Sequence, residues 1–181
     1  MQKVLFLDRD GVINEDSPDH IKNVHEFRFI PGSLESIAKL TQAGFQIFIL
    51  TNQSGIARGL FTLSDLADIH EFLMKSVEKE GGKIAGIFFC PHLPNEACDC
   101  RKPNTGLFEI AKKLYDFCTA DAIMIGDNAK DIIAAVRAGV KTTILVQSGY
   151  TPIDQILPQL PENTPSIIVK DLLHAANWIL R

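Results

Sequence analysis

The chain has 181 residues with 46% apolar content, which suits one well-buried core and is short for two, so we expect residues 1–181 to form a single domain. Its charged fraction of 22% argues against intrinsic disorder. The net charge of −4 argues against a nucleic-acid partner, and an anionic substrate would have to be drawn in by a local cation or metal ion.

Membrane and export signals are not recognisable in the sequence. No run approaches the roughly eighteen apolar residues that a bilayer span requires. A strand-like segment begins by residue 3, which leaves no room for a signal peptide. We therefore expect a cytoplasmic protein without a membrane partner, and a monomer.

Short apolar runs alternate with amphipathic segments, which predicts a parallel β-sheet covered by helices. The expected strands are residues 3–7, 45–50, 84–89, 122–125 and 142–146, with a further short strand at 166–169. The expected helices are the segment between Gly32 and Gly44, then 62–80, 106–117, 129–138 and a terminal helix from 171. The carboxyl ends of parallel strands share one sheet edge, so side chains that follow different strands should meet there.

Two carboxylates, Asp8 and Asp10, directly follow the first expected strand. Alone, this D-x-D-G segment could equally be an exposed turn. However, a charge at the end of a buried strand needs a partner. Asp127 follows the fourth strand, with Asp131 one helical turn later; capping by Asp127 and a solvated Asp131 are the simpler interpretation. Together, Asp8, Asp10 and Asp127, supported by Asp131, would offer the oxygen ligands that Mg²⁺ prefers.

A cation and hydrogen-bond donors for a phosphate group are expected at the same edge. Lys102 is the candidate cation, although a single lysine is by default solvated. Thr51, Asn52, Gln53 and Ser54 follow the second strand and could supply a hydroxyl and backbone N–H groups for phosphate oxygens.

A second metal site is expected between the third strand and the next helix. Cys90 and His92 form C-x-H, and Cys98 and Cys100 form C-x-C, with five residues between the pairs. Four such ligands can close a tetrahedral Zn²⁺ site, which would be structural and would fix the segment that follows, 101–102. Buried thiols without a metal are the alternative. Cys118 stands apart, and we expect it to be a small buried apolar residue.

The order and strand context of these residues resemble the four motifs of the haloacid dehalogenase superfamily of phosphohydrolases. The resemblance implies a Rossmann-like sheet of order 3-2-1-4-5 without a large cap domain. It implies that Asp8 is the nucleophile and Asp10 the general acid and base. Thr51 and Lys102 would steady the phosphoryl group, while Asp8, the Asp10 carbonyl and Asp127 would hold Mg²⁺.

Within that superfamily, three segments resemble the zinc-containing branch: C-P-H-L-P, C-D-C-R-K-P and T-N-Q-S-G-I-A-R-G. This resemblance implies hydrolysis of the 7-phosphate of D-glycero-D-manno-heptose 1,7-bisphosphate, a step toward lipopolysaccharide; histidinol phosphate is the alternative substrate. It implies that Arg58 and Arg101 meet the second phosphate, which histidinol phosphate lacks. Asp16 and Asp19 could contact sugar hydroxyls, or equally a substrate ammonium group.

Two other classes of protein remain as alternatives. A phospho-accepting signalling domain also uses an aspartate at a sheet edge, but Asp10 is placed to hydrolyse an acyl phosphate on Asp8. A zinc-organised binding module without catalysis is supported by the cysteine segment alone.

Overall fold

The computed structural model describes residues 3–162, 164 and 166–181. Its strands are β1 Lys3–Leu7, β2 Phe45–Asn52, β3 Gly86–Cys90, β4 Ile123–Gly126, β5 Thr142–Val146 and β6 Ser166–Val169. Its α-helices are α1 Ser33–Gln42, α2 Leu63–Lys79, α3 Gly106–Leu114, α4 Ala129–Arg137, α5 Ile153–Ile156 and α6 Leu172–Ile179. Short 3-10 helices cover Val24–Glu26, Thr119–Asp121 and Leu157–Gln159.

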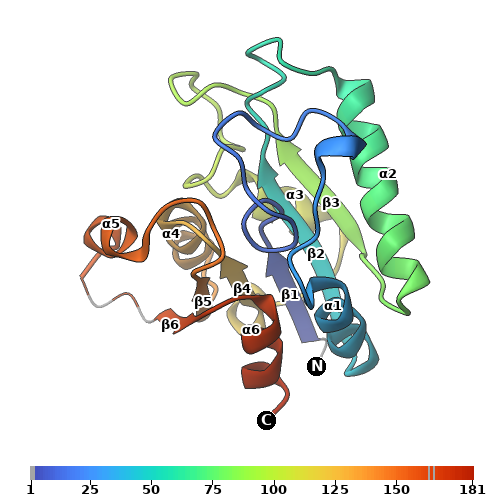
Figure 1. Ribbon diagram of the computed structural model, residues 1–181. Coiled ribbons are helices and arrows are strands. Elements are labelled where there is room, and N and C mark those ends of the chain that lie inside the picture. Colours follow the sequence, from blue (N-terminus) through green and yellow to red (C-terminus); the bar gives the residue numbers. More distant parts are fainter. Residues whose placement is uncertain (1–2, 163, 165) are drawn as a thin grey trace.

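The described strands form one parallel sheet in the order β3-β2-β1-β4-β5-β6. The predicted order 3-2-1-4-5 is confirmed, and the short strand expected at 166–169 extends it by one. The arrows of β1, β3 and β4 in Figure 1 point toward the same end of the sheet, where the long connections after β1, β2 and β3 gather, and parallel pairing puts the carboxyl ends of the other strands there too. This end is the sheet edge at which the sequence predicts a site.

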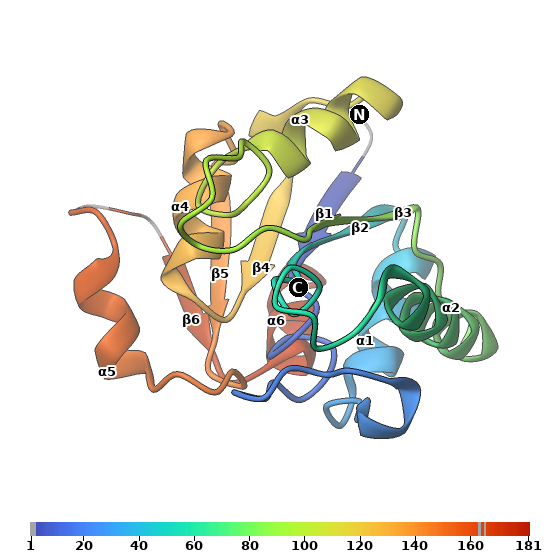
Figure 2. The same ribbon diagram turned by 90° about the horizontal axis from the view of Figure 1, so that it is seen from above.

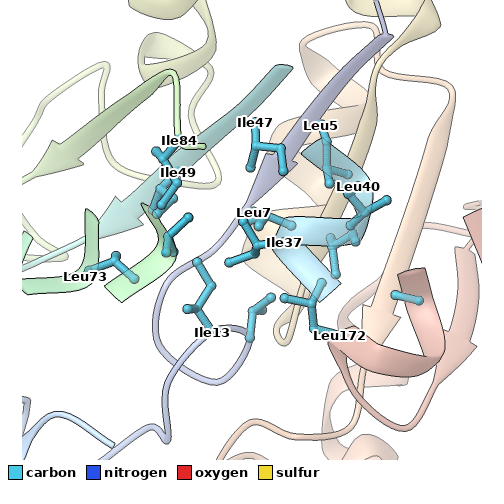
Figure 3. Packing of buried hydrophobic residues seen from close by; sticks show 14 of the residues in the cluster. Leu5, Leu7, Ile13, Ile37, Leu40, Ile47, Ile49, Leu73, Ile84 and Leu172 are labelled. Carbon is cyan, nitrogen blue, oxygen red and sulfur yellow. The ribbon is translucent and has the colours of Figure 1, made fainter. Parts of the chain in front are cut away.

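Helices cover both faces of the sheet, because its central strands are apolar on both sides. Along β1, Leu5 and Leu7 pack with α1, α2 and α6, whereas Val4 and Phe6 pack with α3 and α4. Figure 2 shows α3 and α4 on one side of the strands and α1, α2 and α6 on the other. Figure 3 shows the layer between the sheet and helices α1, α2 and α6, in which Ile47 and Ile49 of β2 face α1 and α2.

Local signals explain most helix boundaries. Thr62 and Asp65 form a reciprocal capping box at the start of α2, and this arrangement satisfies backbone N–H groups that a helix leaves free. Gly44, with a positive φ of 86°, follows α1 and reverses the chain into β2. No helix in the described ranges is long and apolar enough to cross a bilayer.

Three local expectations were wrong in detail. The helix expected at 106–117 ends at Leu114, because Tyr115 turns extended and donates its hydroxyl to the Ala85 carbonyl at 2.7 Å. Cys118, expected to be buried, is exposed in the connection after α3. The short helix α5 was not anticipated, since four residues are too few to display a helical period.

Candidate active site

A cavity of about 140 Å³ lies at the carboxyl ends of the strands. It brings together segments that are distant in sequence. The lining residues are Asp8, Asp10, Asp16, Ser17, His20, Ile21, Thr51, Asn52, Gln53, Ser54, Arg101, Asp127 and Lys130. Nine of these were predicted as site residues: Asp8, Asp10, Asp16, Thr51, Asn52, Gln53, Ser54, Arg101 and Asp127.

Strand register places the first carboxylates side by side. Leu7 of β1 pairs with Ile125 of β4, so Asp8 and Asp127 leave the sheet next to each other. Glycines permit this approach: a Cβ on Gly11 would lie 2.6 Å from Asp127 Oδ2, and a Cβ on Gly149 would also collide with that side chain. Gly11 has a φ of 78°, which glycine tolerates without strain.

A buried lysine joins two of the acids. Lys102 Nζ lies 3.0 Å from Asp8 Oδ1 and 2.7 Å from Asp131 Oδ1, and all three side chains are almost completely buried. The side chain of Asn52 fixes Lys102 by donating to its carbonyl at 3.0 Å and accepting from its N–H at 3.1 Å. Lys102 is therefore not the solvated lysine of the simpler interpretation, and Asp131 is not solvated either.

The helix cap next to these acids also differs from the simpler interpretation. Asn128, not Asp127, is the N-cap of α4, and Asp131 completes the capping box by accepting the Asn128 N–H at 3.1 Å. A Cβ on Gly126 would collide with Asp131. Asp127 is thus left free of capping and faces the cavity.

The buried acids Asp8, Asp127 and Asp131 carry more negative charge than the lysines beside them offset. Burial raises the pKa of Asp8 to about 6, against the lowering effect of Lys102. Burial, together with Asp131 and Asp8, raises the pKa of Asp127 well above its ordinary value. Lys102 and Lys130 provide two positive charges against three carboxylates.

This arrangement fits a divalent cation. Carboxylate oxygens of Asp8, Asp127 and Asp131 all lie within 4.8 Å of one another, and hard oxygen donors suit Mg²⁺. Asp131 is already committed to Lys102 and to the helix cap. A cation would therefore bind mainly to Asp8 and Asp127, which face the cavity.

The side chain of Asp10 points away from that cluster. Its carboxylate accepts hydrogen bonds from Arg9, from Asn14 at 2.8 Å and from Gln53 at 2.7 Å. Burial opposes ionisation of Asp10, but Arg9 and these hydrogen bonds outweigh it and lower its pKa. Gln53 also donates to the Thr51 hydroxyl at 2.9 Å, which orients that oxygen at the cavity wall.

The cysteine segment folds into a compact cluster. Sγ atoms of Cys90 and Cys98 are 3.8 Å apart, and His92 Nδ1 lies 3.2 Å from Cys100 Sγ. A tetrahedral zinc with Zn–S bonds of about 2.3 Å places two sulfurs roughly 3.8 Å apart, so the donor set fits Zn²⁺. The same segment positions Arg101, whose guanidinium donates to the His92 carbonyl at 3.1 Å and lines the cavity.

Some expected and observed residues do not coincide. Asp19 and Arg58 are exposed and lie outside the cavity lining in this structure. Sequence reasoning missed Lys130, Ser17 and His20, which line it. Lys130 lies in the first turn of α4, three residues after Asp127, but this spacing alone does not show which way its side chain faces.

Comparisons with known proteins agree with this geometry. The HAD-hydrolase-like family model matches residues 99–175. D-glycero-beta-D-manno-heptose-1,7-bisphosphate 7-phosphatases from Bordetella bronchiseptica and Pseudomonas aeruginosa are 40% and 41% identical to this chain; each alignment covers 99% of the chain, and 98% and 99% of the respective relatives. The chain belongs to the heptose-bisphosphate phosphatase family of the haloacid dehalogenase superfamily.

Solved structures of the same family share the fold. The D,D-heptose 1,7-bisphosphate phosphatase from B. bronchiseptica, a complex with magnesium and phosphate, superposes with a TM-score of 0.90 at 40% identity, covering 98% of both chains. The Burkholderia thailandensis enzyme gives 0.72 at 32% identity, again covering 98% of both chains. The Rossmann-like architecture that the motifs implied is confirmed for this heptose-bisphosphate phosphatase family member.

Proposed function

We propose that this chain removes the 7-phosphate of D-glycero-β-D-manno-heptose 1,7-bisphosphate through an acyl phosphate on Asp8. One observation supports this most strongly: Asp8, Asp127 and the buried Lys102 converge at the carboxyl edge of the sheet. The relatives that match along nearly the whole chain carry that activity in their names, which favours the heptose substrate over histidinol phosphate.

The first step is attack by Asp8 on phosphorus. The new bond joins an Asp8 carboxylate oxygen to phosphorus, and the bond between phosphorus and the C7 oxygen of the sugar breaks. Lys102, 3.0 Å from Asp8, holds that carboxylate in place and offsets negative charge. The Thr51 hydroxyl, buried at the cavity wall, would donate to a phosphoryl oxygen.

Asp10 transfers the protons. It donates one to the leaving alkoxide in the first step, then takes one from the water that attacks the acyl phosphate, which restores Asp8 and releases phosphate. Arg9 keeps Asp10 ionised in the resting protein. A phosphate dianion arriving beside Asp10 raises its proton affinity, since like charges disfavour ionisation. Asp10 therefore takes up a proton from solvent before the first step and returns one to solvent when phosphate leaves.

Two metals are part of the proposal. When bound at Asp8, the Asp10 carbonyl and Asp127, with Asp131 in support, Mg²⁺ would supply positive charge against the phosphate dianion and the carboxylates. Zn²⁺ would be held by Cys90, His92, Cys98 and Cys100. These four ligands would fill all coordination positions of the zinc ion and leave none for substrate, so the role of zinc would be structural.

The remaining cavity residues would recognise the sugar bisphosphate. Arg101 lines the cavity and would bind the distal phosphate, and Arg58 would contribute from its exposed loop. Asn52 ends β2, Gln53 and Ser54 follow it, and all three would surround the phosphoryl group. Asp16 and Asp19 would accept hydrogen bonds from sugar hydroxyls. We further propose a cytoplasmic, single-domain monomer whose partner is this small substrate, without nucleic-acid or membrane binding.

Phosphate release tests the proposal. Wild-type protein is assayed with heptose 1,7-bisphosphate and with histidinol phosphate, each with and without Mg²⁺, beside Asp8→Asn. We expect Mg²⁺-dependent turnover of the sugar bisphosphate and none in the variant. A strong preference for histidinol phosphate would overturn the substrate, and full activity of Asp8→Asn would overturn the chemistry.

A further inference from the structure

A buried arginine lies directly behind the proton-transferring carboxylate. Arg9 is 0% exposed, which is rare for arginine unless a partner compensates its charge. Its guanidinium contacts both oxygens of Asp10: Nη2 is 2.9 Å from each, and Nε is 3.2 Å from Oδ1. This two-pronged contact fixes the plane of the carboxylate as well as its charge.

The other side of Arg9 is also supported. Nη1 lies 3.5 Å from Nε2 of His70 on α2, and the Cζ atom lies 5.8 Å from the Phe27 ring centroid. A guanidinium carries only donors, so the imidazole must present a lone pair to it. Burial and Arg9 lower the pKa of His70 to about 3, although Asp10 opposes this, which agrees with an acceptor imidazole.

We propose that Arg9 is a positioning residue for proton transfer by Asp10, and that His70 holds Arg9 in place. The inference rests on the proposed function and concerns one part of it. Asp10 is 20% exposed and reaches the cavity, whereas Arg9 does not. Arg9 therefore acts through Asp10, by setting the direction in which that carboxylate faces the leaving oxygen.

A purely structural role for Arg9 would predict something different. If the guanidinium only balanced a buried charge, its loss would lower the amount of folded protein and affect all substrates equally. If the guanidinium orients Asp10, the decrease in activity on removing it depends on the leaving group of the substrate. A sugar alkoxide needs a proton as it departs, whereas p-nitrophenolate is stable without one.

The test is the ratio of kcat/KM for an alkyl phosphate to kcat/KM for p-nitrophenyl phosphate. Both values come from the same preparation, so the ratio is independent of how much protein is folded. The alkyl substrate is heptose 1,7-bisphosphate or any other alkyl phosphate that wild type hydrolyses. The variants are Asp10→Asn as the reference, Arg9→Gln, Arg9→Lys, His70→Leu and His70→Gln, with the exposed Arg28→Gln as control.

We expect Asp10→Asn to lower the ratio by roughly 10²- to 10⁴-fold. Arg9→Gln should lower it by about 10- to 100-fold, the usual cost of misplacing a catalytic group by about an ångström. Arg9→Lys keeps the positive charge but loses the planar guanidinium that contacts both carboxylate oxygens. Its ratio should therefore lie between those of wild type and Arg9→Gln. His70→Leu should lower the ratio a few-fold, while His70→Gln, which keeps an acceptor, and Arg28→Gln should leave it unchanged.

An unchanged ratio in both Arg9 variants would overturn the inference, whatever happens to total activity. Failure of wild type on the heptose substrate would instead overturn the proposed function, and the ratio measured on another alkyl phosphate would still decide the role of Arg9.

Discussion

The sheet edge that carries Asp8 forms one wall of the cavity, and the cysteine segment, Cys90 to Cys100, supports a second wall through Arg101, which follows it; the two walls are stabilised differently. Asp8 follows a strand that is buried on both faces, and Lys102 and Asp131 lie beneath it without solvent access. The cysteine segment between β3 and α3 is mostly half-buried or exposed and contributes little to either core layer. One wall depends on hydrophobic burial and ion pairs, and the other depends on its donor cluster.

The difference shows two ways in which a small protein can hold side chains at one cavity. Core packing fixes groups that must be placed to within a fraction of an ångström. A segment with too little apolar surface to bury can instead be held by a cluster of metal ligands, and here it positions Arg101 at the cavity. Substitutions in the two walls should therefore change activity and stability in different ways.

Asp8→Asn should produce the largest effect. Turnover should fall on the order of 10⁵-fold or more, as for other nucleophiles. The fold should persist, because burial already disfavours the Asp8 charge and Lys102 keeps Asp131 as a partner. Phosphate release and circular dichroism measure the two effects, and unfolding of this variant would contradict the separation of fold from chemistry at this edge.

Lys102→Met should lose both activity and stability. It leaves Asp8 and Asp131 buried without their shared cation, and removing one partner of such a pair costs about 3–5 kcal/mol. The free energy of unfolding in urea measures the loss. Lys112→Met on the exposed face of α3 is the matched control and should change it by less than about 0.5 kcal/mol. Equal effects of the two substitutions would show that the buried pair adds nothing.

Cys98→Ser should act on the other wall alone. We expect loss of zinc by mass spectrometry, new tryptic cleavage after Arg101 and a decrease in kcat/KM of about 10-fold, with Mg²⁺ dependence retained. Cys118→Ser, which removes an exposed cysteine outside the cluster, should change none of these. One zinc per chain in Cys98→Ser would contradict the proposed ligand set.

Arg101→Gln should have the narrowest effect, confined to substrate binding. The side chain lines the cavity, and a lost hydrogen bond to a charged group costs about 1.5–3 kcal/mol. KM for the bisphosphate should therefore rise by roughly 10- to 150-fold, with little change in kcat. Arg137→Gln is the control: Arg137 also donates to this segment, at the Pro103 carbonyl, but lies outside the cavity. A large decrease in kcat would instead place Arg101 in the chemistry.

The sequence by itself determined the order of the strands and of the helices other than α5, and where each strand ends to within two residues. These features depend on local patterns: apolar runs, glycines such as Gly44 and Gly126, and ligand pairs one residue apart such as Cys98 and Cys100. The carboxyl ends of all strands lie at one edge of a parallel sheet. The proximity of Asp8, Thr51 and Asp127 therefore followed from the order of strands and helices along the chain.

Only the tertiary structure decided which way individual side chains face. It buried Arg9 behind Asp10, set His70 of α2 against it, turned Lys130 toward the cavity and left Cys118 exposed. None of these follows from spacing along the chain, because each depends on which neighbour, distant in sequence, supplies a partner or takes up the available space.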